Sequence, residues 1–292
     1  MVFRRLRPVR GLRSDLRGGE AEPQGRGGSR HVSRPNVRAD EYPAVHARLA
    51  AAEDELGRLQ EDQVAGRTPV KRAPASGGRQ TLKLLPYRRY AGVNRDDPLR
   101  FYYWPVLGKL YRRRIELCLT ECTGGARVLE VGFGSGVAFC NLNEMYDEIH
   151  GLDLTANIGE VEAVFQGLGI ETRLCNGSVL SLPYEDGFFD TVLLISILEH
   201  LKPVELEGAF REISRVLKPD GQVVYGVPIE RGIMVVLFRL LGCDIRRHHF
   251  STERDVHETA GRFLREARTV QMRSAVGAVY EVGHFRKAEL TR

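Results

Sequence analysis

The chain has 292 residues, of which 42% are hydrophobic and 28% charged, as in a globular protein with an adequate core. The net charge of +5 is concentrated at one end, because residues 1–40 hold ten arginines and four acids, a balance of +6, which leaves −1 for the other 252 residues. A nearly neutral remainder argues against a broad nucleic-acid-binding face, and no apolar run reaches the roughly 18 residues of a membrane-spanning helix.

The five cysteines do not indicate a disulfide framework, since their number is odd and no CxxC pair occurs. Cys118 and Cys122 stand four residues apart in a helical stretch, without a matching histidine cluster. We therefore expect free thiols in a reducing cytoplasm and no metal site.

The first 82 residues are predicted to contain three segments ahead of the main domain. Residues 1–40 are rich in Arg and Gly and predict a disordered basic tail. A dispensable extension, an organellar transit peptide and a tail that binds nucleic acid or an acidic surface all stay open for it. Residues 41–64 predict an amphipathic helix, because Val45, Leu49, Ala52, Leu56 and Leu59 recur at helical spacing. That helix either folds onto its own domain or pairs weakly with a second copy, so we expect a monomer or weak homodimer. Residues 65–82 read as a linker, and the main domain is placed at 100–292.

Within the main domain, helical and strand-like segments alternate. A helix is predicted from Leu107 toward Cys122, and strands are predicted around 149–154, 171–177, 191–196 and 223–227, with helical periodicity between them. "RTVQMRS" and "AVYEVGHFRK" follow, separated by "AVG", and predict an antiparallel hairpin. This rhythm predicts an α/β fold with a Rossmann-like, doubly wound sheet, mostly parallel and closed by an antiparallel C-terminal hairpin.

One stretch, "RVLEVGFGSGVAFCNL" (127–142), predicts a ligand-binding turn between a strand and a helix. Gly132, Gly134 and Gly136 stand at alternate positions, where a bare backbone can approach a nucleotide-like ligand. Asp153 follows 17 residues after the last glycine and could accept hydrogen bonds from ribose hydroxyls. The dinucleotide fingerprint GxGxxG requires its third small residue where this chain has Val137, so the spacing argues against NAD without removing it as an alternative.

Four successive segments resemble the motifs of class I S-adenosylmethionine-dependent methyltransferases, in their methyltransferase-11-like, small-molecule branch. They are "VLEVGFGSG", "GLDLT", "NGSVLSLPYEDGFFDTVLLISILEHL" and "FREISRVLKPDGQVVYGVP". The resemblance implies S-adenosylmethionine as the cofactor, with the glycine turn under its methionyl part and Asp153 at its ribose. It further implies cofactor contacts from Glu130, Leu154, Ser178, Val179, Ile195 and Ser196.

One departure and one candidate catalytic residue accompany this resemblance. The family often has Gly-Asp where this chain has Gly177-Ser178, so the contact to the adenine amine passes to Ser178 or Asn176. His200 lies just beyond the fourth strand and could deprotonate an acceptor hydroxyl, because imidazole titrates near neutrality. A structural role for His200 is the alternative, as a helix cap is for Asp153.

The methyl acceptor is expected to contact the segments that resemble the family least. These are the aromatic cluster "RFYYW" (100–104) and the insert at 228–255, whose apolar part (232–241) could line a pocket or touch a membrane. The candidate acceptor contacts are Tyr103, Trp104, Tyr225, His248 and His249.

The sequence thus predicts methyl transfer, with oxygen favoured as the receiving atom, to a small molecule or to a glycan- or lipid-linked, membrane-associated acceptor, and no nucleic-acid partner. A non-catalytic methyltransferase-fold scaffold or partner subunit and an NAD-dependent oxidoreductase remain the alternatives. A nucleic-acid methyltransferase is disfavoured, because "ISILEHL" stands where a base-flipping Asn/Asp-Pro-Pro-Tyr/Phe motif would follow the fourth strand.

Overall fold

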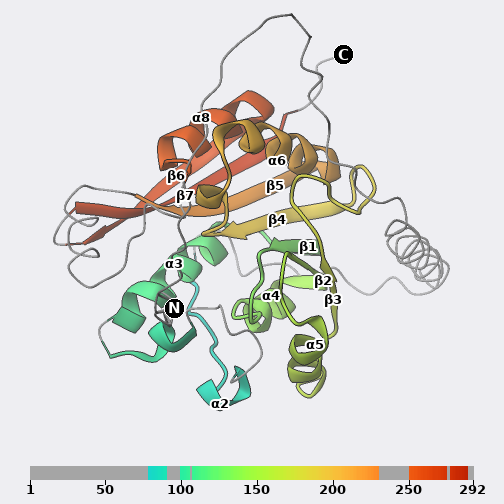
Figure 1. Ribbon diagram of the computed structural model, residues 1–292, viewed down its shortest axis with the longest axis vertical. Helices are drawn as coiled ribbons and strands as arrows, with labels where there is room; N and C mark the ends of the chain where they lie inside the picture. Colours follow the sequence, from blue (N-terminus) through green and yellow to red (C-terminus); the bar gives the residue numbers. More distant parts are fainter. Residues whose placement is uncertain (1–77, 91–98, 106, 230–249, 275–276, 289–292) are drawn as a thin grey trace, which may run out of the picture. The chain divides into compact units, whose positions relative to one another are not determined.

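The computed structural model describes residues 78–90, 99–105, 107–229, 250–274 and 277–288, which all belong to one compact unit spanning Pro69–Arg292 (Figure 1). The predicted tail (1–40), the amphipathic helix (41–64), the apolar insert (232–241) and both His248 and His249 lie outside the described residues. No helix in the described part of the chain is both long and apolar enough to cross a membrane.

Helices and strands alternate through the unit as the sequence predicts. In chain order they are α2 (Tyr87–Tyr90), η2 (Leu99–Tyr103), α3 (Leu107–Glu121), β1 (Gly125–Val131), α4 (Phe139–Met145), β2 (Tyr146–Asp153), α5 (Ile158–Gln166), β3 (Thr172–Asn176), β4 (Phe189–Ile195), η3 (Leu198–His200), α6 (Pro203–Val216), β5 (Leu217–Pro228), α8 (Glu253–Phe263), β6 (Leu264–Ser274) and β7 (Gly277–Lys287).

The described strands form one seven-stranded sheet in the order β3-β2-β1-β4-β5-β7-β6. Strands β1 to β5 pair in parallel, and β7 pairs antiparallel with both β5 and β6. The predicted fold class, including the antiparallel C-terminal hairpin, is therefore confirmed.

Helices cover both faces of this sheet and create two cores (Figure 1). Side chains of α3, α4 and α5 pack in one core, and side chains of α6 and α8 pack in the other. Successive strand residues point to opposite faces, so Val128 joins the α3 side while Leu129 joins the α6 side. Both faces are apolar, as expected of a sheet covered by helices on each side.

Helix α8 is absent from the sequence prediction, although a local signal marks its start. The Thr252 hydroxyl accepts a hydrogen bond from the Asp255 N–H (3.3 Å), and the Asp255 carboxylate accepts one from the Thr252 N–H (2.8 Å). This reciprocal capping box satisfies two donors that a helix N-terminus otherwise leaves unpaired. The pattern "TERD" could have located the helix.

Residues ahead of position 100 also pack against the sheet unit. The Gln80 N–H donates to Thr120 Oγ1 (3.2 Å), the Lys83 N–H donates to Asn141 Oδ1 (2.9 Å), and the Leu82 side chain is buried. The compact unit thus includes part of the segment that the sequence analysis assigns to the linker at 65–82, and it begins before residue 100.

Candidate functional site

The strand order brings the motif-bearing segments to one edge of the sheet. Strand β1 lies between β2 and β4, so the connections from β1 and β4 leave toward opposite sides of the sheet. In open α/β sheets, ligands bind beyond the carboxyl ends of the strands at such a reversal. The glycine turn follows β1, Asp153 ends β2, and Ser196 follows β4, so all three meet at this edge.

The glycine turn needs its glycines for more than one physical reason. Gly132, Gly134 and Gly136 have φ values of +73°, +54° and +71°, in the left-handed region that side chains disfavour. A Cβ on Gly136 would stand 2.6 Å from an atom of Phe139, so this glycine allows core packing. A Cβ on Gly132 would stand 2.0 Å from Ile197 Cδ1, so that glycine allows the turn to contact the loop after β4.

The Asp153 carboxylate links the end of β2 to the glycine turn. Its Oδ2 accepts a hydrogen bond from the Gly134 N–H (3.0 Å), and its Oδ1 accepts from the Thr155 and Ala156 N–H groups (both 2.9 Å). Two carboxylate oxygens offer about four acceptor positions, so about one remains for a ligand hydroxyl. The helix-cap alternative for Asp153 is wrong for the helix that follows, because the N-cap of α5 is Asn157; Asp153 instead accepts from the turn after β2 and keeps about one acceptor position.

The residues expected at the adenine follow β2 and β3. Leu154, directly after β2, is 72% exposed, whereas Val179, after β3, is buried. The Ser178 hydroxyl accepts a hydrogen bond from the Leu180 N–H (3.2 Å). The Asn176 amide donates to the carbonyl oxygens of Asp153 (3.2 Å) and Ala156 (3.1 Å), which ties β3 to the turn after β2.

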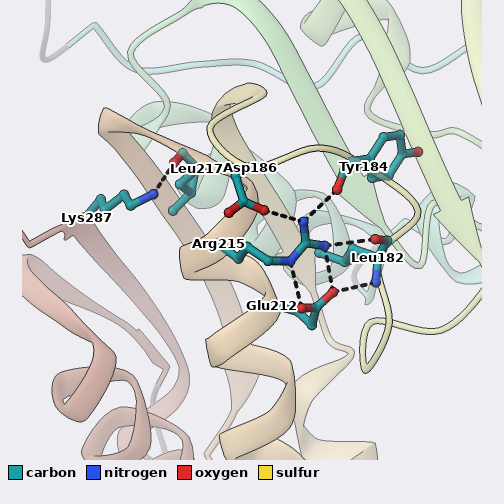
Figure 2. A network of polar contacts seen from close by, with 7 residues as sticks. All are labelled: Leu182, Tyr184, Asp186, Glu212, Arg215, Leu217 and Lys287. Carbon is teal, nitrogen blue, oxygen red and sulfur yellow. Dashed lines mark hydrogen bonds and ion pairs between the residues drawn. The ribbon is translucent and has the colours of Figure 1, made fainter.

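Arg215 of α6 holds this segment in place (Figure 2). Its guanidinium donates to the carbonyl oxygens of Tyr184 (2.7 Å) and Leu182 (2.9 Å) and to the carboxylates of Glu212 (2.8 Å) and Asp186 (2.9 Å). The Leu182 N–H donates to Glu212 Oε2 (2.8 Å), which closes the network. A planar fork with five donors suits such a convergence of acceptors, and it fixes the loop that begins at Ser178.

Glu130, the second-last residue of β1, is almost fully buried, with 3% of its surface exposed. Its charge acts on the α3 side of the sheet. Burial raises the pKa of the Cys122 thiol to about 12, and the Glu130 carboxylate contributes in the same direction. Both Cys118 and Cys122 are buried and free, so they remain protonated core residues.

The end of β4 carries an unusual backbone conformation. Ser196 has a φ of +58° and is the one non-glycine residue with a positive φ in the described ranges. Its hydroxyl lies 3.2 Å from Arg114 Nη1 and 3.0 Å from the Tyr280 hydroxyl. Ile195 precedes it at the end of β4 and is partly buried. Neither Arg114 nor Tyr280 is among the residues that the sequence analysis selects.

The predicted catalytic and acceptor residues are spread over several places. His200 is exposed at the end of η3. The Tyr103 hydroxyl donates to the Leu85 carbonyl oxygen, and Trp104 is half-exposed. Tyr225 is fully buried in the α6–α8 core, with its hydroxyl 3.4 Å from His257 Nδ1. Roles for these four side chains in catalysis or acceptor binding stay predictions. Among the described residues, no group of three or more His, Cys, Asp or Glu could hold a metal ion.

The aromatic cluster (100–104) and Tyr111 connect the half-exposed Trp104 with the end of β4. The Trp104 ring lies 5.3 Å from that of Phe101, which lies 5.2 Å from the Tyr111 ring. The Arg114 guanidinium stands 4.1 Å above the Tyr111 ring and reaches Ser196 on its other side. A continuous series of contacts therefore joins the half-exposed Trp104 to Ser196 at the end of β4.

Comparison with known proteins gives consistent matches. Residues 129–225 match the family model of the methyltransferase domain. Over 139 residues the chain is 36% identical to YcgJ, an uncharacterised methyltransferase of Bacillus subtilis, covering 47% of this chain and 51% of YcgJ. Over 116 residues it is 29% identical to the demethylmenaquinone methyltransferase of Tropheryma whipplei, covering 38% of this chain and 46% of that protein. The chain thus spans about half the length of these relatives.

Solved structures share the fold. The N-methyltransferase NodS of Bradyrhizobium japonicum, in complex with S-adenosylhomocysteine, aligns with a TM-score of 0.52 at 19% identity, covering 69% of this chain and 96% of NodS. The PH0226 protein of Pyrococcus horikoshii aligns with a TM-score of 0.50 at 18% identity, covering 69% of this chain and 98% of that protein. The match to the methyltransferase domain thus covers residues 129–225, and the compact unit around it shares the fold of these solved structures.

Proposed function

We propose that this protein transfers a methyl group from S-adenosylmethionine to a small-molecule or a glycan- or lipid-linked acceptor, with oxygen as the favoured receiving atom. The observation that carries the proposal is the pairing of Asp153 with the glycine turn, since its carboxylate bonds to the Gly134 N–H at the sheet reversal and keeps about one acceptor position. That position suits a ribose hydroxyl.

The residues at this edge fit the cofactor in chemistry as well as in place. Gly132 and Gly134 leave bare main chain where a methionyl group would lie. Leu154 offers an exposed apolar side chain beside Asp153, which suits an adenine face. Ser178 and the main chain of Val179 offer polar groups for the adenine edge. When bound, the cofactor would supply a methyl group already activated as a sulfonium.

The chain's own task is then to orient the acceptor, exclude water and remove a proton where the acceptor is a hydroxyl. Orientation alone can contribute several kcal/mol to the reduction of a barrier. The aromatic contacts from Trp104 to Arg114 support an acceptor with an apolar or ring-containing part. His200, exposed beyond β4, is the candidate base.

A reducing compartment, the cytoplasm, is the proposed location, because the four described cysteines are free. Monomeric or weakly dimeric protein and the absence of a nucleic-acid partner remain part of the proposal. A scaffold without activity and an NAD-dependent oxidoreductase are the functions to be tested against it.

Calorimetric titration with S-adenosylhomocysteine, S-adenosylmethionine and NAD tests the proposal. We expect both adenosyl ligands to bind and NAD not to bind. Binding of NAD alone would favour an oxidoreductase, and binding of none to folded protein would favour a scaffold.

Substitution of Asp153 tests the placement of the site. We expect Asp153→Ala to weaken S-adenosylhomocysteine binding by about 1.5–3 kcal/mol, because a charge-assisted hydrogen bond is lost. Asp153→Asn retains an amide oxygen for the Thr155 and Ala156 N–H groups, so it separates the loss of charge from the loss of the turn after β2. Asp220→Ala, at an exposed position before β5's buried part, is the control. Unchanged affinity in folded Asp153→Ala would show that the ribose site lies elsewhere.

A further inference from the structure

The backbone of Ser196 is in a conformation that requires an explanation. A non-glycine residue in the left-handed region is strained, and such strain persists only where the surroundings determine it. Ser196 stands at φ +58° directly after β4, at the edge where the cofactor is proposed to bind. No glycine occupies this position, so the surrounding side chains must maintain its conformation.

Three elements hold Ser196. Its N–H donates to the Gly226 carbonyl oxygen of β5 (2.8 Å). Its hydroxyl accepts a hydrogen bond from Arg114 Nη1 of α3 (3.2 Å) and lies 3.0 Å from the Tyr280 hydroxyl of β7. Bonds from three directions leave this residue little freedom to relax.

Tyr280 reaches Ser196 by crossing a neighbouring strand. Strand β7 pairs with β5, and β5 pairs with β4, so the ring must pass over β5. Gly226 makes the passage possible, because a Cβ there would stand 2.5 Å from the Tyr280 hydroxyl oxygen. Tyr280 is 1% exposed, and burial raises the pKa of its hydroxyl well above the usual value, so the group stays protonated and able to donate.

Arg114 is fixed as well. Its guanidinium lies over the Tyr111 ring at 4.1 Å and is 5.6 Å from the centre of the Tyr280 ring. A cation held over aromatic faces is stabilised by their negative quadrupoles. Arg114 therefore reaches Ser196 from a defined position.

The conformation of Ser196 determines where the next residue lies. Ile197 follows directly, and its side chain occupies the space that a Gly132 side chain would take. The end of β4 thereby closes over the first glycine of the turn after β1. Relaxation of Ser196 to an ordinary conformation would redirect Ile197 away from that turn.

We propose that Arg114 and Tyr280 are positioning residues that hold Ser196 in its left-handed conformation, so that Ile197 closes on Gly132 and completes the methionyl side of the cofactor site. The ligand in this inference rests on the proposed function. The left-handed conformation of Ser196 and its support by Arg114 and Tyr280 are properties of the chain and can be tested without a ligand.

Two substitutions of Ser196 separate a positioning role from direct contact. Ser196→Ala removes the hydroxyl and leaves the conformational strain, whereas Ser196→Gly removes the hydroxyl and the strain together. We expect Ser196→Ala to lose about tenfold in S-adenosylhomocysteine affinity, equivalent to about 1.4 kcal/mol. Ser196→Gly should stay within about threefold of the unaltered protein, because glycine adopts this conformation without cost.

Tyr280→Phe tests the supporting hydroxyl. We expect a loss of about three- to tenfold in affinity, the range of one neutral hydrogen bond, and recovery when Ser196→Gly is added. Tyr146→Phe is the matched control, since its buried hydroxyl bonds to Thr191 Oγ1 (2.8 Å) far from this edge, at the start of β2. It should lose stability without losing affinity.

Chemical denaturation of the ligand-free variants gives a second measurement. Glycine normally destabilises a strand or helix relative to alanine. Here Ser196→Gly should unfold at a higher denaturant concentration than Ser196→Ala. If the unaltered protein fails to bind S-adenosylhomocysteine, the proposed function is wrong, and this order of stability still decides the positioning role.

Two results would overturn the inference. Equal losses of affinity in Ser196→Ala and Ser196→Gly would mean that the hydroxyl contacts the ligand directly. Equal or reversed stability of the two ligand-free variants would mean that the conformation at Ser196 carries no strain for Arg114 and Tyr280 to offset.

Discussion

Substitution of Gly132 by alanine tests whether the glycine turn depends on close contact with the loop after β4. Gly132 has a φ of +73°, and a Cβ there would approach Ile197 Cδ1 to 2.0 Å and Cγ1 to 2.6 Å. A side chain in the left-handed region costs about 1–2 kcal/mol. Overpacking typically costs about 1–3 kcal/mol more. The sum is a loss of about 2–5 kcal/mol in the free energy of unfolding.

Gly169 provides the matched control for the backbone contribution. It has a φ of +70°, and nothing lies within 4 Å of a Cβ built there. Gly169→Ala should therefore lose only about 1–2 kcal/mol. Denaturant unfolding of both variants gives the contact contribution as the difference between them.

Affinity for S-adenosylhomocysteine, measured by calorimetry, provides the functional measurement. If Ile197 rotates to relieve the clash, stability recovers in part but the closed arrangement over the turn is lost. We therefore expect Gly132→Ala to bind at least tenfold more weakly, while Gly169→Ala binds normally. Equal stability and equal affinity in the two alanine variants would refute the reasoning, because the Ile197 contact would then have no energetic weight.

Two further predictions concern stability. Arg215→Leu should lose about 3 kcal/mol in the free energy of unfolding, because its charge-assisted hydrogen bonds to the Leu182 and Tyr184 carbonyls disappear. Arg254→Leu breaks only an exposed ion pair and should leave the free energy of unfolding almost unchanged. Similar losses in denaturant unfolding of the two variants would contradict the role of Arg215 in fixing the segment after β3. Burial, and after it nearby arginines, lowers the pKa of His284 from 6.5 to about 4, so the unfolded chain binds more protons than the folded one between these pH values. Stability should fall as pH drops from 6.5 to 4, by up to about 3 kcal/mol, and His284→Gln should flatten that part of the profile.

The parts of the fold that could be predicted from the sequence are those with local signals. The buried strands are short apolar runs, and the turn after β1 is marked by glycines at alternate positions. Two β-rich segments around a short turn predict the antiparallel hairpin of β6 and β7. The distance of Asp153 from the glycines marks it as a candidate, and the structure places it against Gly134.

The side chains that support the site could not be predicted from spacing. Arg114 of α3 and Tyr280 of β7 come from distant segments and meet at Ser196 only because the fold packs α3 on the sheet and places β7 beside β5. The sequence carries a weak signal of this arrangement, since Gly226 interrupts the bulky run from Val223 to Val227 in β5. A glycine within a strand often marks the close approach of another group. The sequence alone does not say which group approaches.

The proposed cofactor contacts and the proposed acceptor contacts come from different kinds of structure, and this explains why the acceptor is harder to infer than the cofactor. The proposed cofactor contacts come mainly from strand ends and from a turn whose conformation the fold requires, so they are readable as motifs. The proposed acceptor side rests instead on ring contacts such as those from Trp104 to Tyr111, and the sequence does not distinguish such rings from ordinary core packing. Because the proposed acceptor contacts come from side chains that no motif fixes, acceptor screening should vary the apolar and ring-containing part of candidate molecules before varying the group to be methylated.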